Sequence, residues 1–319
     1  MDLRPSAPFT ALWTIRFTHT DPSGYVFFPR YFNMLHGVLE EWFTDAIRLP
    51  FADLILKRRI GTPTAAIQCQ FLRPCRLGEK LSVAVRIDHI GTTSLRLRFQ
   101  GRVDGELRLD ALSTLVITDL DSGRPQAIPD DLRARLEAYR QGDRQAEAPQ
   151  PIAPRWPDVA QTPEALRAQL AAAPFAASLP VRFTHTDPAG YVFFPRYFDM
   201  LQAAVEDWFT NALGQSYADL YNLRRLGTPA AATQARFARP SRMGDRLSVA
   251  VLLEHLGTSS LRLRFFGTGG GELRLEAVST LVMISRDDGR PRPVPDDLRS
   301  RMAAYGRGAA QPASAPPER

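Results

Sequence analysis

The stretch HTDPSGYVFFPRYF, residues 19–32, returns as HTDPAGYVFFPRYF at residues 185–198. Moving 166 residues along the chain from any point between 15 and 141 reaches the counterpart without a gap, and 21 of the 28 residues from 16 to 43 are identical. The period is far longer than the roughly 20 to 50 residues of a solenoid repeat. The chain of 319 residues therefore carries two copies of one domain, as a prior of about 150 residues per domain also suggests.

The copies divide the chain into four predicted parts. We expect a first domain at 1–141, a linker rich in proline and alanine at 142–176, a second domain at 177–306 and a disordered tail at 307–319. Within the linker, only the segment PEALRAQLAAA at 163–173 has a helical pattern.

Each copy begins with a strand and a long helix. In the first copy the helix is predicted at 29–47, with apolar residues at helical spacing on a face wide enough to be covered on most sides. Alternating patterns then predict four strands, and a short helix follows at 129–140. The predicted strands are 12–18, 64–73, 80–90, 94–103 and 106–118. Strands joined by short turns run antiparallel, so the sequence predicts an α+β fold in which an antiparallel five-stranded sheet wraps around one long helix, built twice.

Composition predicts an ordinary soluble protein. Hydrophobic residues make up 44% and charged residues 23% of the chain, which lacks both a secretory signal and an apolar run of membrane-spanning length; we therefore expect a cytoplasmic protein without a membrane partner. Cys69 and Cys75 correspond to Ala235 and Ser241 in the second copy. A disulfide or metal site essential to the repeat would occur twice, so these are predicted to be structural thiols, and no metal is expected.

Arginine dominates the basic residues. Of 40 basic residues only Lys57 and Lys80 are lysines, and the net charge is +6. In LRLRF, at 95–99 and 261–265, arginine alternates with apolar residues, which predicts arginines on the solvent face of a strand. A nucleic-acid module is the rival suggested by charge and by the aromatic run, but Pro29 argues against a base-stacking strand and the basic residues are scattered. We expect no nucleic-acid partner.

The turn at the head of the repeated stretch carries the candidate chemistry. Asp21, Pro22, Ser23 and Gly24 suit the successive positions of a type I turn. The turn leads into a helix start, where backbone N–H groups lack intrahelical acceptors. A carboxylate beside such donors can act as nucleophile or general base while the donors stabilise an oxyanion, as hydrolysis of an acyl group requires.

The segments DPSGYVFFPRY and DPAGYVFFPRY resemble the 4-hydroxybenzoyl-CoA thioesterase branch of the hot-dog fold, whose signature is an Asp-Pro-Ala-Gly turn, an aromatic run and Pro-x-Tyr. The resemblance continues through Gly61-Thr62-Pro63 and covers nearly all of each copy. It implies a tandem hot-dog acyl-CoA thioesterase with two sites in one chain. Coenzyme A would be part of the substrate, so no separate cofactor is expected. A homodimer of such chains is a further assembly that the resemblance suggests.

The resemblance also implies roles for individual residues. Asp21 and Asp187 would be the catalytic carboxylates, and the backbone N–H groups of Phe28 and Phe194 would polarise the thioester carbonyl. The implied substrate-binding residues are Tyr25, Tyr191, His36, Gln202, Thr62 and Thr228.

Two departures from the family concern specificity. His36 and Gln202 stand where the family member specific for a phenolic acyl group has a carboxylate for the hydroxyl, so the two sites can differ in preference. Where the family has basic residues near the CoA phosphates, this chain has Gly91-Thr92-Thr93 and Gly257-Thr258-Ser259. Other arginines would then have to bind the phosphates, and the candidates are Arg73, Arg76, Arg239 and Arg242.

Other chemistries remain open at this stage. His19 and His185 precede each Asp by two residues, which on a strand places both on one face; a His-Asp pair would suit a hydratase or dehydratase, although a structural role is favoured. Glu40 and Glu206 could be the base of another thioesterase branch, but the His-Gly-Gly run of that branch is missing, so helix-surface or polar-network roles are favoured. A non-catalytic acyl-CoA sensor is the third alternative.

Overall fold

The computed structural model describes residues 9–143, 168, 170 and 173–308, and the chain forms two compact units that meet in sequence between Pro154 and Arg155. Helix α2 continues to Asp143 and strand β8 begins at Ala176, at the edges of the predicted linker. The predicted helix at 163–173 and the predicted tail at 307–319 lie almost wholly outside the described residues. None of the helices in the described parts is long and apolar enough to cross a membrane.

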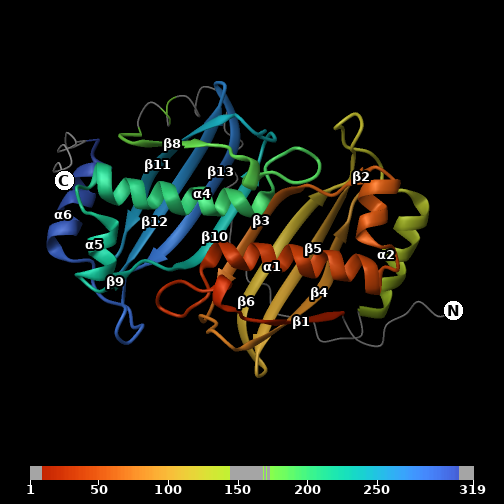
Figure 1. Ribbon diagram of the computed structural model, residues 1–319, viewed down its shortest axis with the longest axis horizontal. Helices are drawn as coiled ribbons and strands as arrows, with labels where there is room; N and C mark the ends of the chain where they lie inside the picture. Colours follow the sequence, from red (N-terminus) through yellow and green to blue (C-terminus); the bar gives the residue numbers. More distant parts are fainter. Residues whose placement is uncertain (1–8, 144–167, 169, 171–172, 309–319) are drawn as a thin grey trace. The chain divides into compact units, whose positions relative to one another are not determined.

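Unit 1 is a curved antiparallel sheet with one long helix across a face (Figure 1). Its strand order is β1-β4-β5-β6-β3, and every neighbouring pair is antiparallel. Short strands β2 and β7 pair with each other outside this sheet. The elements in chain order are β1 (Thr10–Thr14), a 3₁₀ turn (Phe17–His19), α1 (Phe28–Glu41), π-helical turns (Trp42–Ala46 and Asp53–Lys57), β2 (Ile60–Gly61), β3 (Thr64–Phe71), β4 (Lys80–Ile90), β5 (Ser94–Val103), β6 (Glu106–Val116), β7 (Thr118–Asp119) and α2 (Asp130–Asp143).

Unit 2 repeats this arrangement with the order β10-β13-β12-β11-β8, again antiparallel throughout. Its elements are β8 (Ala176–Pro180), a 3₁₀ turn (Phe183–His185), α4 (Phe194–Asp207), a π-helical turn (Trp208–Ala212), α5 (Tyr217–Asn222), β9 (Leu226–Gly227), β10 (Ala230–Phe237), β11 (Arg246–Leu256), β12 (Ser260–Gly269), β13 (Glu272–Val282), β14 (Ile284–Ser285) and α6 (Asp296–Gly306). The predicted α+β fold, a five-stranded antiparallel sheet with a long helix built twice, is confirmed.

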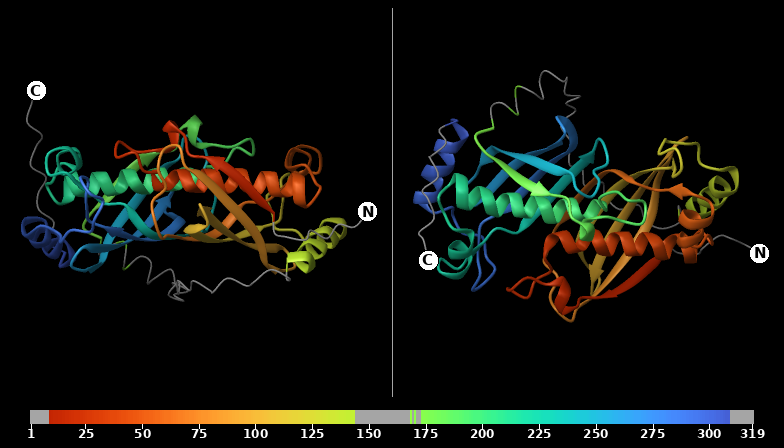
Figure 2. Two further views of the ribbon diagram at one scale, coloured as in Figure 1. Left: turned by 90° about the horizontal axis from the view of Figure 1, so that it is seen from below. Right: turned by 45° about the horizontal axis from the view of Figure 1, so that its top comes forward.

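The long helix of each unit lies against one face of its sheet, as the left view of Figure 2 shows, and the buried side chains of the core lie between them. In α1 the predicted stripe is buried, with Phe32 and Val38 fully so. Alternate residues of the long strands supply the other side of the core, and in β4 these include Val83 and Val85. Burying one large apolar side chain stabilises a fold by about 1.5 to 3 kcal/mol. The helix is therefore held firmly in its place on the sheet.

The helix also packs closely against the edge strand of unit 1. A Cβ atom added to Gly37 would come within 2.5 Å of the Trp13 ring of β1, so glycine leaves the room that the indole occupies. In unit 2 the corresponding residues are Ala203 and Leu179. Unit 2 therefore has a smaller strand side chain, Leu179 in place of Trp13, and a larger helix residue, Ala203 in place of Gly37.

The first strand is shorter than predicted. Instead of spanning 12–18, β1 ends at Thr14, and the chain turns through the 3₁₀ turn Phe17–His19. The N–H of Arg16 donates to Nδ1 of His19 at 3.0 Å. This local side-chain acceptor competes with the strand ladder for the backbone, which explains why the alternating pattern overestimated the strand.

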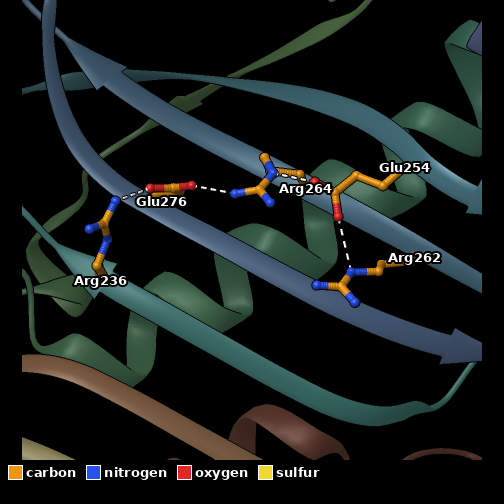
Figure 3. Close-up of polar contacts among 5 residues, drawn as sticks. All are labelled: Arg236, Glu254, Arg262, Arg264 and Glu276. Carbon is orange, nitrogen blue, oxygen red and sulfur yellow. Dashed lines mark hydrogen bonds and ion pairs between the residues drawn. The ribbon is translucent and has the colours of Figure 1, made fainter. Parts of the chain in front are cut away.

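The predicted solvent face of the LRLRF strands is only partly solvent-exposed. In unit 2, Arg264 of β12 is buried and contacts two carboxylates, those of Glu276 on β13 and Glu254 on β11. Glu276 also contacts Arg236 of β10, and Glu254 accepts a hydrogen bond from Arg262 at 3.0 Å. The five residues form one chain of ion pairs that crosses β10, β13, β12 and β11 (Figure 3).

Unit 1 carries a smaller version of this network. Asp110 of β6 accepts hydrogen bonds from Arg98 and Gln100, and Asp88 pairs with Arg96. Gln70 stands where Arg236 stands in unit 2. In both units, the most buried arginine of the network pairs with a carboxylate on a neighbouring strand.

Removing the central carboxylate should destabilise unit 2. The side chain of Glu276 is 2% exposed and that of Arg264 is 10% exposed. Breaking a buried ion pair at one partner typically costs about 3 to 5 kcal/mol because the other charge stays buried. We expect Glu276→Gln to lower the free energy of unfolding by about 3 kcal/mol, measured by urea denaturation.

Glu272, on the same strand, provides the matched control. It pairs with Arg239 at 2.7 Å, and both side chains are about half exposed. Exposed pairs contribute about 1 kcal/mol or less, so Glu272→Gln should change stability little. Equal losses in the two variants would contradict the role given to the buried network.

Candidate active site

The Asp-Pro-x-Gly segment forms the predicted turn in both units. The carbonyl of Asp21 accepts the N–H of Gly24 at 2.9 Å, and the N–H of Asp21 donates to the carbonyl of Tyr25 at 2.8 Å. Gly24 has a φ of +79°, the left-handed conformation that glycine adopts without strain. The result is a three-residue hairpin loop with a bulge at the glycine.

The Asp carboxylate is anchored within this loop. In unit 1, Oδ1 of Asp21 accepts the N–H of Ser23 at 2.8 Å. In unit 2, Oδ1 of Asp187 accepts the N–H groups of Ala189 at 2.9 Å and Tyr191 at 3.4 Å. Both aspartates are half-buried. The loop therefore fixes one carboxylate oxygen in each unit and so restricts where the other can point.

The loop leads directly to the long helix. Thr20 pairs with Val26 across the hairpin, and α1 begins two residues later at Phe28. Pro29, in the first turn, has no N–H and a φ suited to a helix start. The same order recurs from Asp187 to Phe194 and Pro195. Each predicted carboxylate is thus separated from its predicted oxyanion donor by one short hairpin, within one unit.

His19 and His185 do not lie on a strand, so the shared strand face considered for a His-Asp pair is not formed. Each occupies a 3₁₀ turn, and its Nδ1 accepts a backbone N–H, from Arg16 and Arg182 respectively, at 3.0 Å. Burial lowers the pKa of His19, and the guanidinium groups of Arg16 and Arg30 lower it further. An imidazole that is neutral and uses Nδ1 as an acceptor carries its proton on Nε2.

Tyr25 and Arg76 form a contact that sequence patterns did not reveal. The guanidinium of Arg76 lies 5.3 Å from the centroid of the Tyr25 ring and donates to its hydroxyl at 3.3 Å. Tyr191 and Arg242 repeat the arrangement with 5.2 and 3.3 Å. The predicted substrate-binding tyrosine and one predicted phosphate ligand are therefore neighbours in each unit.

The other two candidate phosphate ligands have acidic partners. Arg73 pairs with Glu106 at 2.8 Å, and Arg239 pairs with Glu272 at 2.7 Å. A phosphate would have to compete with these carboxylates. Arg76 and Arg242, which contact tyrosines, remain the better candidates of the four.

The two units differ around His36 and Gln202. In unit 1, Nε2 of His36 lies 3.2 Å from Oε1 of Glu40, one turn along α1, and its ring packs edge-on against Phe51. In unit 2, the amide of Gln202 donates to Glu206 at 2.9 Å and to the hydroxyl of Tyr217 at 3.4 Å. Glu40 and Glu206 are exposed members of these polar networks, as favoured from the sequence.

Tyr217 connects two of the predicted substrate-binding residues. Its hydroxyl lies 3.0 Å from Oγ1 of the buried Thr228, and burial raises its pKa. Phe51 occupies the corresponding sequence position in unit 1, where its ring packs against His36 and Phe43. The sequence reasoning missed this pair, although the exchange of Phe for Tyr between otherwise similar copies was visible in the alignment of the repeats.

Comparison with known proteins places both copies in one family. The sequence pattern of the thioesterase-like superfamily matches residues 15–136 and again residues 181–302. The chain belongs to this superfamily. Each match begins before the Asp turn and ends in the C-terminal helix of its unit, so both turns lie inside the shared domain.

Two relatives of this thioesterase-like protein are 1,4-dihydroxy-2-naphthoyl-CoA hydrolases. The protein from Nostoc punctiforme is 27% identical over 139 residues, which cover 44% of this chain and 93% of the relative. The protein from Thermosynechococcus vestitus is 32% identical over 119 residues, which cover 37% of this chain and 81% of the relative. Each relative therefore corresponds to about one copy of the repeat.

Solved structures that are similar over most of the chain include two further thioesterases. The 12:0-ACP thioesterase from Umbellularia californica has a TM-score of 0.62 at 14% identity, with 86% of this chain and 94% of that chain covered. An acyl-ACP thioesterase from Bacteroides thetaiotaomicron has a TM-score of 0.60 at 14% identity, with 86% and 97% covered. At this identity they support the fold of the superfamily alone.

The histidines beside the turns make stability depend on pH. Because the pKa values of His19 and His185 are lowered in the folded protein, protonation favours the unfolded chain. Their contribution to stability is present above the unfolded pKa of about 6.5 and is lost as the pH falls below it. We expect stability to decrease between pH 7 and pH 5, and this slope to be smaller in the His19→Asn/His185→Asn variant.

Asparagine is the substitution of choice because its carbonyl oxygen can replace Nδ1 as acceptor for the backbone N–H. Urea denaturation at a series of pH values measures the effect. The same slope in wild type and variant would show that other groups govern stability in this range.

Proposed function

We propose that the chain hydrolyses acyl-CoA thioesters to a free acid and coenzyme A, with Asp21 and Asp187 as the catalytic carboxylates. The observation that carries the proposal is the pairing, in both matched copies, of an anchored carboxylate with a helix that starts one hairpin later. The hydrolase names of the two relatives support the reaction class. Their acyl group supports an aromatic acyl substrate.

The carboxylate can act in two ways. As a general base it takes a proton from water, whose oxygen attacks the thioester carbonyl carbon. The C–S bond then breaks, and the CoA sulfur receives a proton. As a nucleophile it forms a mixed anhydride and releases CoA, and water then cleaves the anhydride to restore the carboxylate. In both routes the N–H groups of Phe28 and Phe194 would stabilise the negative carbonyl oxygen of the intermediate.

Asp→Asn substitutions test the assignment. The asparagine side chain keeps an oxygen acceptor for the N–H groups of Ser23 and Ala189, so the turn should persist. We expect Asp21→Asn and Asp187→Asn each to retain partial activity, and the double variant to lose at least about 100-fold, as removal of a catalytic base or nucleophile typically does. The measurement is release of free thiol from a panel of aromatic and aliphatic acyl-CoAs.

Each alternative gives a different result in this panel. Turnover near that of wild type in a correctly folded double variant would contradict the assignment. Water addition to an enoyl-CoA without thiol release would indicate a hydratase, and binding of acyl-CoA without turnover would indicate a sensor. Thermal unfolding of each variant is the control for folding.

We further propose that Tyr217 and Phe51 give the two units different acyl preferences. In unit 2 the polar chain from Gln202 through Tyr217 to Thr228 offers hydrogen bonds that suit a ring hydroxyl. In unit 1 the aromatic ring of Phe51 beside His36 suits an unsubstituted ring. Sites built to hydrogen-bond a hydroxyl discriminate strongly against substrates that lack it.

The repeat offers a reciprocal test of this preference. Tyr217→Phe should lower the ratio of kcat/KM for a hydroxylated over an unsubstituted aromatic acyl-CoA, and Phe51→Tyr should raise it. One lost or gained hydrogen bond should change this ratio about tenfold at the altered site. The change measured for the whole chain will be smaller, because the unaltered site also contributes turnover. Changes in the same direction for both variants, or no change, would contradict the proposal.

A further inference from the structure

Exposed apolar side chains recur at the same positions in both units. Phe17 and Phe183 correspond, at 81% and 78% exposure, and so do Leu77 and Met243, at 49% and 60%. The other large exposed hydrophobics among the described residues do not recur. Leu12, Leu56, Leu72 and Leu223 correspond to Ser178, Asn222, Ala238 and Lys57. The copies thus diverged elsewhere on the surface and kept these two apolar positions.

Backbone hydrogen bonds bring the two positions together beside the Asp turn. The N–H of Gly78 donates to the carbonyl of Ile15 at 2.9 Å, and the N–H of Leu77 donates to the carbonyl of Gly24 at 3.2 Å. In unit 2 the N–H of Gly244 donates to the carbonyl of Val181 at 3.1 Å, and Tyr191 after the turn pairs with Arg242 before Met243. The exposed Phe, the exposed Leu or Met and the turn therefore belong to one region in each unit.

Cations surround these apolar residues at matching positions. We name the region the turn surface: it comprises Arg16, Phe17, Arg76, Leu77 and Lys80 in unit 1, and Arg182, Phe183, Arg242, Met243 and Arg246 in unit 2. All ten residues are exposed. The acids of the same hairpins, Glu79 and Asp245, accept backbone N–H groups at 2.8 and 2.9 Å. Counting also Asp21 or Asp187 of the adjoining turn, each region has three cations and two acids, and it is net positive.

The shape of the turn surface favours a macromolecule as its partner. Small ligands occupy concave pockets that enclose most of their surface, whereas Phe17 and Phe183 project into solvent. A projecting aromatic residue flanked by guanidinium groups suits the recess of an acidic protein surface, where aromatic and arginine side chains contribute most to binding. The turn surface adjoins the candidate catalytic turn. A partner bound there could therefore present a thioester to the candidate carboxylate.

We propose that each turn surface docks an acidic carrier protein that presents the acyl thioester on a phosphopantetheine arm. That the carrier bears an acyl thioester rests on the proposed thioester hydrolysis, whereas the docking of the carrier protein does not. The chain would then accept the same acyl group from two donors, free CoA and the carrier. Arg76 and Arg242 could serve both donors, and only the carrier would need the exposed phenylalanines and Arg16 or Arg182.

Binding of an unacylated carrier tests docking without any reaction. The probe is a purified holo acyl carrier protein from the host organism, titrated against the full chain by isothermal calorimetry. We expect Phe17→Ser/Phe183→Ser and Arg16→Glu/Arg182→Glu each to weaken binding at least tenfold. Raising the salt concentration from 50 to 300 mM should weaken binding by wild type, because exposed charges are screened.

Leu12→Ser/Leu223→Ser is the matched control. It removes two leucines that are 64% and 75% exposed and are not part of the turn surface, and it should bind like wild type. No binding by wild type, equal weakening by the control, or binding to phosphatidylglycerol vesicles in place of the carrier would overturn the proposal.

A kinetic measurement separates this proposal from the proposed function. With the same acyl group on both donors, Phe17→Ser/Phe183→Ser should lower the ratio of kcat/KM for carrier over CoA at least tenfold, and an unchanged ratio would contradict the proposal. Hydrolysis of acyl-CoA without carrier binding would overturn docking alone. Carrier binding without hydrolysis of either thioester would overturn the hydrolase assignment and leave docking standing.

Discussion

The burial of one wide helical face against the sheet is the constraint on which each unit depends. Helices α1 and α4 present large side chains to the long strands, and residues such as Phe32 and Phe198 are fully buried. The Asp turn is joined to the first residue of the helix by a short hairpin. Once the helix is packed, the carboxylate and the helix N-terminus are held at one end of it.

The turn itself contributes a second level of order. Its glycine adopts a left-handed conformation, and its Asp accepts a backbone N–H with one carboxylate oxygen. A carboxylate used for catalysis must be held in a fixed orientation, because errors of about 1 Å in placement greatly reduce rates. The same hydrogen bonds that close the hairpin supply that orientation, so the structural and the proposed catalytic roles of the Asp are compatible.

Much of the fold could be predicted because its signals are local and strong. The strands at 80–90 and 94–103 were predicted at their observed bounds, since alternation over ten or more residues leaves little ambiguity. The strand predicted at 12–18 was wrong beyond Thr14, because the Nδ1 acceptor of His19 competes with the ladder. Burial of Arg264 was missed because its partner, Glu276, lies on a neighbouring strand.

The candidate site also has features with a local sequence signal and features that depend on contacts between distant residues. The aspartates and the helix starts could be located from one contiguous motif, whereas the contact of Tyr25 with Arg76 joins residues 51 positions apart. The connection from Gln202 through Tyr217 to Thr228 likewise depends on tertiary packing. Comparing the two copies position by position partly overcomes this limit, since differences such as Phe51 and Tyr217 mark where the units diverge.

The most direct test of the account is a crystal structure of the Asp21→Asn/Asp187→Asn variant with an intact aromatic acyl-CoA. We predict a thioester carbonyl oxygen within about 2.7 to 3.1 Å of the backbone nitrogen of Phe28 or Phe194, the usual range for an oxyanion donor. The carbonyl carbon should face the substituted side chain of residue 21 or 187. A bound acyl-CoA whose carbonyl lies away from both helix N-termini would contradict the central claim.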